Sequence, residues 1–123
     1  MNLDPFHLTD HEMSPTDSAA ALADGSLTLV DVREAYEWDA GRVPGSVHIP
    51  LDRLAEEAAT LPGDKPIAFI CLSGARSAMA TSAFRAAGYE AFNVTGGFRA
   101  WLQAGAPVEP EGAVAAPHGR PPT

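Results

Sequence analysis

The sequence predicts an α/β fold in which a mainly parallel β-sheet is covered by helices on both faces. Short apolar segments at 27–32, 66–70 and 90–94 have the composition of strands, and the first two are apolar enough to be buried on both faces. Segments with helical patterning alternate with these strands and are joined to them by short loops. This alternation is typical of a parallel sheet, because each strand needs a crossover before the next parallel strand can begin.

The first half of the chain is expected to start with a polar, irregular extension over residues 1–13. Ser14 is the expected N-cap, and Pro15 the first residue, of a helix that ends at Asp24-Gly25. The elements predicted next are a strand over 27–32, a short helix over 34–40, a turn over 41–45 and a short strand over 47–50.

The second half is predicted to contain, in order, an amphipathic helix over 51–61, a turn over 62–64, a strand over 66–70, a helix over 77–87, a strand over 90–94 and a helix over 98–104. Residues 105–123 hold five prolines, three glycines and no aromatic residue, so they can add little to a core. We therefore expect one domain over 14–108, between an N-terminal extension over 1–13 and a flexible Pro/Gly/Ala-rich tail over 109–123.

Composition and charge exclude several classes of function. A net charge of −8 argues against nucleic acid or an anionic membrane surface as the partner. The four histidines are scattered and none has a ligand spacing to the one cysteine, so we expect no metal site. No apolar run reaches the roughly 20 residues that cross a bilayer, and the first residues lack the features of a signal peptide. A cytoplasmic protein is expected, which agrees with a lone, unpaired thiol.

Cys71 is the candidate nucleophile. It follows the 66–70 strand and precedes a short loop and the 77–87 helix, so loop amides and the helix N-terminus converge on the sulfur. Such surroundings favour the thiolate, which is the nucleophilic form of cysteine. The alternative is that Cys71 is only a small buried hydrophobic residue.

The residues around Cys71 have expected roles of their own. Gly74 gives the loop a tight backbone. Ser73 and Ser77 either cap the helix or donate hydrogen bonds to the sulfur. Arg76 either binds an anion or is a solvated arginine of the first helical turn.

A second group of polar residues follows the first core strand and faces the same edge of the sheet. Asp31 and Arg33 lie there, and Arg33 is expected to pair with Glu37, four residues on, or with another acid. These three residues are expected to support the rim of the site, and a direct catalytic role of Asp31 and Arg33 is the alternative. His48 is expected to be a satisfied strand residue rather than a base, and Trp101 a core residue. Gly96-Gly97 begins a helix near the rim, where it either allows close packing, which is the simpler interpretation, or approaches the substrate.

Three stretches together resemble the rhodanese family of sulfurtransferase domains. They are 29–37 with 41–50, the Cys71–Ser77 loop, and 94–101 with 105–107, and the similarity covers about residues 14–108 in the family's order. The resemblance implies a three-layer fold with a five-stranded parallel sheet. It also implies that Cys71 accepts sulfane sulfur as a persulfide and passes it to a nucleophile, without a cofactor.

The resemblance further implies which residues and partners take part. The substrate-binding loop would consist of Leu72, Ser73, Gly74, Ala75, Arg76 and Ser77. The donor would be a small anion such as thiosulfate, or a persulfide, and the acceptor a thiol, cyanide or a protein. Leu72 and Ala75 stand where thiosulfate-preferring members often carry cationic or polar residues, which favours a persulfide donor here.

Two alternative functions share this fold. The related phosphatases and arsenate reductases have five residues between cysteine and arginine, whereas four separate Cys71 from Arg76, so this loop is expected to be too small for phosphate. A non-enzymatic sulfur-carrier or interaction module is the other alternative. Interaction modules of this kind usually lack the cysteine, which this chain keeps.

Overall fold

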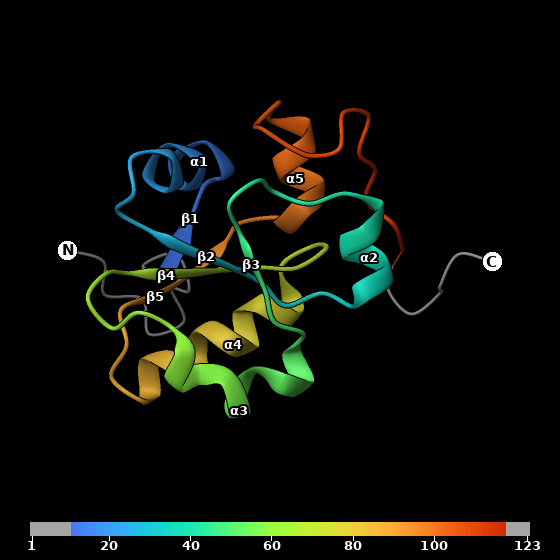
Figure 1. Ribbon diagram of the computed structural model, residues 1–123. Coiled ribbons are helices and arrows are strands. Elements are labelled where there is room, and N and C mark those ends of the chain that lie inside the picture. The colour runs from blue at the N-terminus through green and yellow to red at the C-terminus, as the bar shows by residue number, and fades with distance from the viewer. Residues whose placement is uncertain (1–10, 118–123) are drawn as a thin grey trace.

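The computed structural model describes residues 11–117 and contains one five-stranded sheet in the order β1-β5-β4-β2-β3 (Figure 1). The strands are β1 (Glu12–Met13), β2 (Thr28–Asp31), β3 (Val47–His48), β4 (Ile67–Ile70) and β5 (Ala91–Val94). All four strand pairs are parallel. The predicted fold class, an α/β domain with a five-stranded parallel sheet, is therefore confirmed.

Helices cover both faces of the sheet, as Figure 1 shows. On one face, α1 (Pro15–Ala23) and α5 (Gly97–Gln103) pack beside each other. The other face carries α4 (Ala75–Ala86) and the segment formed by η2 (Leu51–Arg53), α3 (Leu54–Glu57) and η3 (Ala58–Thr60). The remaining helix, α2 (Ala35–Ala40), lies beyond the carboxyl end of β2.

The core consists of two layers separated by the sheet, because successive side chains of a strand point to opposite faces. Leu29 and Ala68 belong to the layer under α1 and α5, whereas Val30 and Phe69 belong to the layer under α4. This arrangement explains why β4 is apolar throughout and why β2 has apolar residues on both faces. Trp101 is fully buried, as expected, and its Nε1 donates to the carbonyl of Pro107 at 2.8 Å.

The N-terminal helix begins as predicted, but an additional strand precedes it. Ser14 caps α1, because its Oγ accepts a hydrogen bond from the amide of Asp17 at 3.0 Å. The sequence predicted irregular structure through residue 13, and this is wrong for Glu12 and Met13, which form β1 and pair with Asn93 and Val94 of β5. Two residues are too few for a hydrophobic period to appear in the sequence. Residues 1–10 of the expected extension lie outside the described part of the chain.

The segment after β3 differs from the single helix predicted over 51–61. Two turns of 3-10 helix flank four residues of α-helix. Of the residues expected on its apolar face, Leu54 and Leu61 are buried and Leu51 and Ala58 are half-buried, but Ala55 is exposed. Leu61 is extended, as residues before proline usually are, and this ends the segment.

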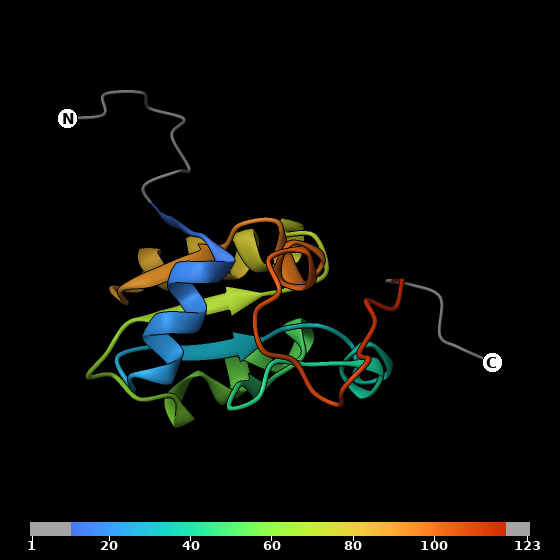
Figure 2. The same cartoon turned by 90° about the horizontal axis from the view of Figure 1, so that it is seen from above.

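The chain after α5 returns along the molecule to α2, as the red segment in Figure 2 shows. Arg42 and Glu109 exchange backbone hydrogen bonds of 2.9 and 2.8 Å, and the amide of Val114 donates to Ala40. A Cβ on Gly41 would lie 2.5 Å from the Cβ of Ala113, so only glycine permits this approach. The described part of the expected tail, 109–117, therefore contacts the domain, and residues 118–123 lie outside the described range. Within 11–117 no helix is long and apolar enough to cross a membrane.

Candidate active site

Cys71 lies directly after β4, where the backbone turns into α4. The helix begins at Ala75, two residues earlier than predicted, and Gly74 precedes it with a φ of 111°. Residues with a Cβ adopt this left-handed region only at a cost, so glycine permits the turn that folds the loop back over the sulfur. The Cys71 side chain is 1% exposed.

Three donors point at the sulfur of Cys71. The amide of Gly74 lies 3.1 Å from Sγ, the amide of Ser77 3.4 Å and the hydroxyl of Ser77 3.3 Å. Neither Ser73 nor Ser77 caps α4, and Ser73 is exposed, so of the two roles considered for Ser77 the structure shows contact with the sulfur. Donors arranged in this way stabilise negative charge on sulfur.

The start of α5 holds the backbone of Cys71 in place from the other side. The amides of Phe98 and Arg99 donate to the carbonyls of Cys71 and Leu72 at 2.7 and 3.1 Å. A Cβ on Gly97 would lie 2.5 Å from the carbonyl oxygen of Cys71, which shows how closely the two segments approach. Close packing is thus the role of Gly97 that the structure supports.

Two ion pairs lie beside the loop, one buried and one partly buried, and the partners of Arg33 and Glu37 differ from the predicted ones. Arg76 Nη1 and Nη2 donate to the two carboxylate oxygens of Glu37 at 2.8 and 2.9 Å. Arg33 pairs with Asp31 instead, with Nη2 at 2.8 Å from Oδ2. The predicted pair of Arg33 with Glu37 is therefore wrong, although Arg33 does pair with another acid. Arg33 also donates to the carbonyl of Gly41 and stacks on the ring of Phe98.

The pair of Glu37 with Arg76 shifts the ionisation of both groups in the direction that favours charge. Burial disfavours the charged carboxylate of Glu37, but hydrogen bonds from Arg76 and from the amide of Glu34, with the positive charges of Arg76 and Arg33, outweigh it and lower its pKa. Burial likewise disfavours the charge of Arg76, and the bonds and charge of Glu37 outweigh it and raise the pKa of Arg76. Arg76 is therefore neutralised locally and its guanidinium faces Glu37.

The other expected loop residues divide into buried and exposed ones. Leu72 is 6% exposed, so little of its side chain is available to contact a donor. Ser73 and Ala75 are exposed and form the outer surface of the loop. His48, as expected, is a satisfied strand residue, because it stacks on Trp38 and its Nε2 lies 2.8 Å from the carbonyl oxygen of Arg33.

Two polar residues near the sulfur were missed by the sequence analysis. Asn93 of β5 lies within hydrogen-bond distance of Ser77, and its Nδ2 donates to the carbonyl of Gly74 at 3.2 Å. Glu12 of β1 accepts from the same Nδ2 at 3.1 Å. The available signal for Asn93 was a polar residue inside the otherwise apolar run Ala91–Val94. Nothing in the sequence places Glu12 near it.

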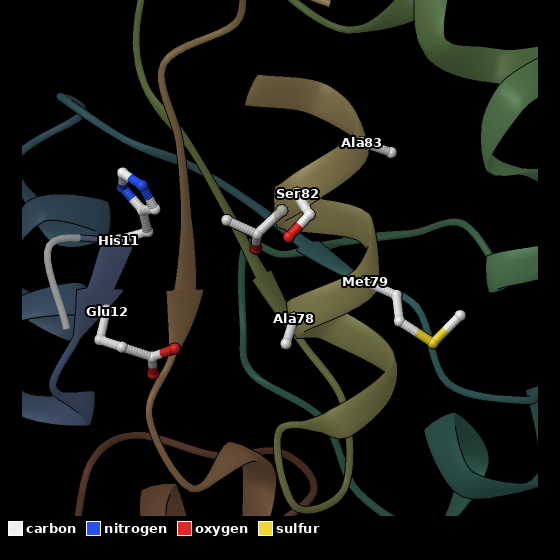
Figure 3. A pocket seen from close by; sticks show the side chains of 7 residues that line it. His11, Glu12, Ala78, Met79, Ser82 and Ala83 are labelled. Atoms are coloured by element: carbon white, nitrogen blue, oxygen red, sulfur yellow. The ribbon is translucent and has the colours of Figure 1, made fainter. Parts of the chain in front are cut away.

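A hollow of about 540 Å³ lies between β1 and α4 (Figure 3). Its lining consists of His11, Glu12, Ala78, Met79, Thr81, Ser82 and Ala83. The carboxylate of Glu12 extends toward α4 in this view. Cys71 and the loop residues 72–77 do not line this hollow, so it is separate from the sulfur site.

Comparisons with known proteins place this geometry in a family. The family model of the Rhodanese-like domain matches residues 14–104. The thiosulfate sulfurtransferase GlpE of Pseudomonas savastanoi pv. phaseolicola is 32% identical over 95 residues, covering 76% of this chain and 90% of GlpE. The HTH-type transcriptional regulator Rv0324 of Mycobacterium tuberculosis is 44% identical over 92 residues, covering 72% of this chain but 40% of the regulator.

A solved structure agrees with these matches. The crystal structure of a rhodanese-related protein from Thermoplasma volcanium superposes with a TM-score of 0.74 at 33% identity. The match covers 80% of this chain and 96% of that chain.

Proposed function

Because the chain belongs to the rhodanese-like domain family, we propose that it is a sulfurtransferase in which Cys71 carries sulfane sulfur as a persulfide. The observation that supports this role is the convergence of the Gly74 amide, the Ser77 amide and the Ser77 hydroxyl on the Cys71 sulfur. Covalent catalysis of this kind needs one thiolate and no second cysteine, and the chain has one cysteine.

The proposed reaction has two displacements. In the first, the Cys71 thiolate attacks the outer sulfur of the donor, an S–S bond forms on Cys71, and sulfite leaves if the donor is thiosulfate, or a thiolate if it is a persulfide. In the second, the acceptor attacks the terminal sulfur, and the Cys71 thiolate is the leaving group. Negative charge thus appears on the Cys71 sulfur before the first step and after the second, and on the terminal sulfur in between.

The loop supplies fixed donors for this charge. The amides of Gly74 and Ser77 are held by the turn and by the start of α4, so they need no reorganisation when the charge develops. The burial of Cys71 keeps water from competing for these hydrogen bonds.

The charge of the loop favours a donor of low charge. Arg76 is paired with Glu37, and the net charge of the chain is −8. A doubly negative donor such as thiosulfate is therefore attracted by little beyond the loop amides. We propose that the physiological donor is a persulfide on a small thiol or a protein, that the acceptor is a thiol or protein, and that the reaction takes place in the reducing cytoplasm.

Mass spectrometry of the intact protein tests this function. After incubation with thiosulfate or a persulfide of a small thiol, the protein is expected to gain the mass of one sulfur atom and to lose it when cyanide is added. Since Cys71 is the single cysteine, Cys71→Ser is the matched control and should gain nothing. Absence of the sulfur adduct with both donors would refute the proposal. Loading without release to cyanide or a thiol would favour the sulfur-carrier alternative instead.

A further inference from the structure

The hydroxyl of Ser77 has one proton and three acceptors within reach. They are Asn93 Oδ1 at 2.5 Å, Cys71 Sγ at 3.3 Å and the carbonyl oxygen of Gly74 at 3.3 Å. All of these groups are buried, so water does not share in the competition. One proton can serve one of these acceptors well at a time.

The orientation of the Asn93 amide decides which acceptor holds the proton when Cys71 is uncharged. Asn93 Nδ2 donates to the Glu12 carboxylate at 3.1 Å and to the carbonyl oxygen of Gly74 at 3.2 Å. Both of its hydrogens are thus used, and the oxygen Oδ1 faces Ser77. Because an amide oxygen can only accept, the hydrogen bond must run from the hydroxyl to Asn93. The lone pairs of the Ser77 oxygen then remain available to the thiol proton of Cys71.

We propose that Asn93 is a positioning residue for Cys71. Its side-chain amide oxygen competes with the Cys71 thiolate for the hydrogen bond from the Ser77 hydroxyl. When the sulfur is uncharged, the hydroxyl donates to Asn93. When Cys71 becomes a thiolate, the sulfur is the stronger acceptor, and the hydroxyl rotates to it. No proton leaves Ser77 in this exchange, because only the direction of its O–H bond changes.

This exchange has a consequence for sulfur transfer, and that part of the inference rests on the proposed function. Once the persulfide has formed, the inner sulfur carries no charge, and the hydroxyl returns to Asn93. When the acceptor removes the outer sulfur, charge reappears on Cys71 and the hydroxyl turns back. Because Asn93 Oδ1 accepts the Ser77 hydroxyl whenever the sulfur is uncharged, the hydroxyl hydrogen has a hydrogen-bond partner at every stage of the reaction.

The anchor of this arrangement is β1, the strand that the sequence analysis missed. Glu12 accepts from Asn93 and also from Thr95, whose Oγ1 lies 2.8 Å from Glu12 Oε1. The carboxylate therefore prevents the amide of Asn93 from turning over, since a reversed amide would place its oxygen against Glu12.

The charged groups around Cys71 come from several elements. They are Arg76 of α4, Glu37 of α2, Glu12 of β1, Arg99 of α5, and Asp31 and Arg33 at the end of β2. An experiment on the Ser77 hydroxyl must keep the influence of these charges on the Cys71 thiolate constant. A double-mutant cycle does so, because the charges are present in all of its variants.

The cycle consists of the full chain, Ser77→Ala, Asn93→Leu and the double variant. The thiolate fraction is read from its ultraviolet absorbance over a pH series, with Cys71→Ser as the blank, so no sulfur donor is needed. We expect Ser77→Ala to lower the thiolate fraction near neutral pH by about tenfold, the effect of one lost hydrogen bond to a charged group. The fold-change in thiolate fraction caused by Asn93→Leu should be about three times more favourable with Ser77 present than in the Ser77→Ala background.

Equal effects of Asn93→Leu in the two backgrounds would refute the competition, because a purely structural role of Asn93, including its influence on Glu12, acts in both. A fold-change that is less favourable to the thiolate with Ser77 present than in the Ser77→Ala background would refute it as well. If Asn93→Leu does not fold, the unmodified chain supplies the test.

That second test follows the side-chain carbonyl carbon of Asn93 by NMR. The chain has two asparagines, Asn2 and Asn93, so the signal is readily assigned. It should shift with the pH at which the Cys71 thiolate forms, and this shift should disappear in Ser77→Ala. A carbonyl chemical shift that stays the same when Cys71 is converted from thiol to thiolate would refute the proposal. Neither measurement depends on sulfur transfer, so failure of the proposed function and failure of this inference are distinguishable.

Discussion

Gly97 is the position where a single methyl group should damage the site most. Its φ is +63°, and a Cβ would lie 2.5 Å from the carbonyl oxygen of Cys71 and 2.6 Å from the carbonyl carbon and oxygen of Leu72. These neighbours are backbone atoms of the loop that begins at Cys71, so they cannot rotate away as a side chain would. Gly97→Ala must therefore move α5 away from Cys71.

Gly105 provides a matched control at the other end of the same helix. Its φ is +71°, and a Cβ there would meet nothing within 4 Å. Gly105→Ala should therefore lower the free energy of unfolding only by the cost of a left-handed alanine, about 1–2 kcal/mol. Gly97→Ala has this cost too and also weakens the hydrogen bonds from Phe98 and Arg99 to the loop, at about 1 kcal/mol each.

The expected difference between the two variants is thus about 2 kcal/mol. For a chain of this length that corresponds to a Tm lower by roughly 8 °C in Gly97→Ala than in Gly105→Ala, measured by circular dichroism. In a thiosulfate-to-cyanide assay, Gly105→Ala should keep its activity within about twofold, whereas Gly97→Ala should lose at least about tenfold, because a 1 Å displacement of a reacting group has this effect or more. Equal Tm values, or full activity in Gly97→Ala, would show that the contact with α5 does not position Cys71.

Three further predictions follow from the same contacts. Glu37→Gln should lower the free energy of unfolding at pH 7 by about 2 kcal/mol, since it removes a charge-assisted pair with Arg76. Folding lowers the pKa of Glu37, so the pair stabilises the fold above about pH 4.3, and this stabilisation is lost as the pH falls through the pKa of Glu37 in the folded protein. The difference in Tm between the variant and the unmodified chain should therefore be smaller at pH 3 than at pH 7. A constant difference would contradict this. Deletion of residues 109–123 should lower the Tm by several degrees, because the two backbone hydrogen bonds between Glu109 and Arg42 are lost; an unchanged Tm would support the flexible tail that the sequence predicts. Finally, kcat/KM should be at least about tenfold higher with a persulfide of a small thiol than with thiosulfate at matched ionic strength, and equal values would show that the loop amides outweigh the unfavourable charge.

The sequence by itself determined the features that depend on short stretches of chain. The segments before Asp31 and before Cys71 form strands, because a strand buried on both faces has a nearly continuous apolar sequence. The 90–94 segment forms β5 although Asn93 interrupts its apolar run. The position of Cys71, the proposed nucleophile, also follows locally, since the end of a strand, a glycine loop and a helix start are adjacent in the chain.

Features that depend on distant residues were decided by the tertiary structure. The four-residue spacing of Arg33 and Glu37 predicts a pair only if both belong to one helix, but α2 begins at Ala35, after Arg33. Arg33 therefore turns to Asp31, and the carboxylate of Glu37 receives Arg76, 39 residues further along the chain.

The surroundings of Ser77 depend even more on residues that are distant in the sequence. Asn93 and Glu12 are 81 residues apart, and they meet because β1 adds to the edge of the sheet beside β5. A strand of two residues has no pattern of its own, and its existence depends on the unpaired edge that β5 offers. The sequence therefore determined that Cys71 lies between the end of a strand and the start of a helix. The packing of the sheet decided which side chains control the hydrogen bonds around its sulfur.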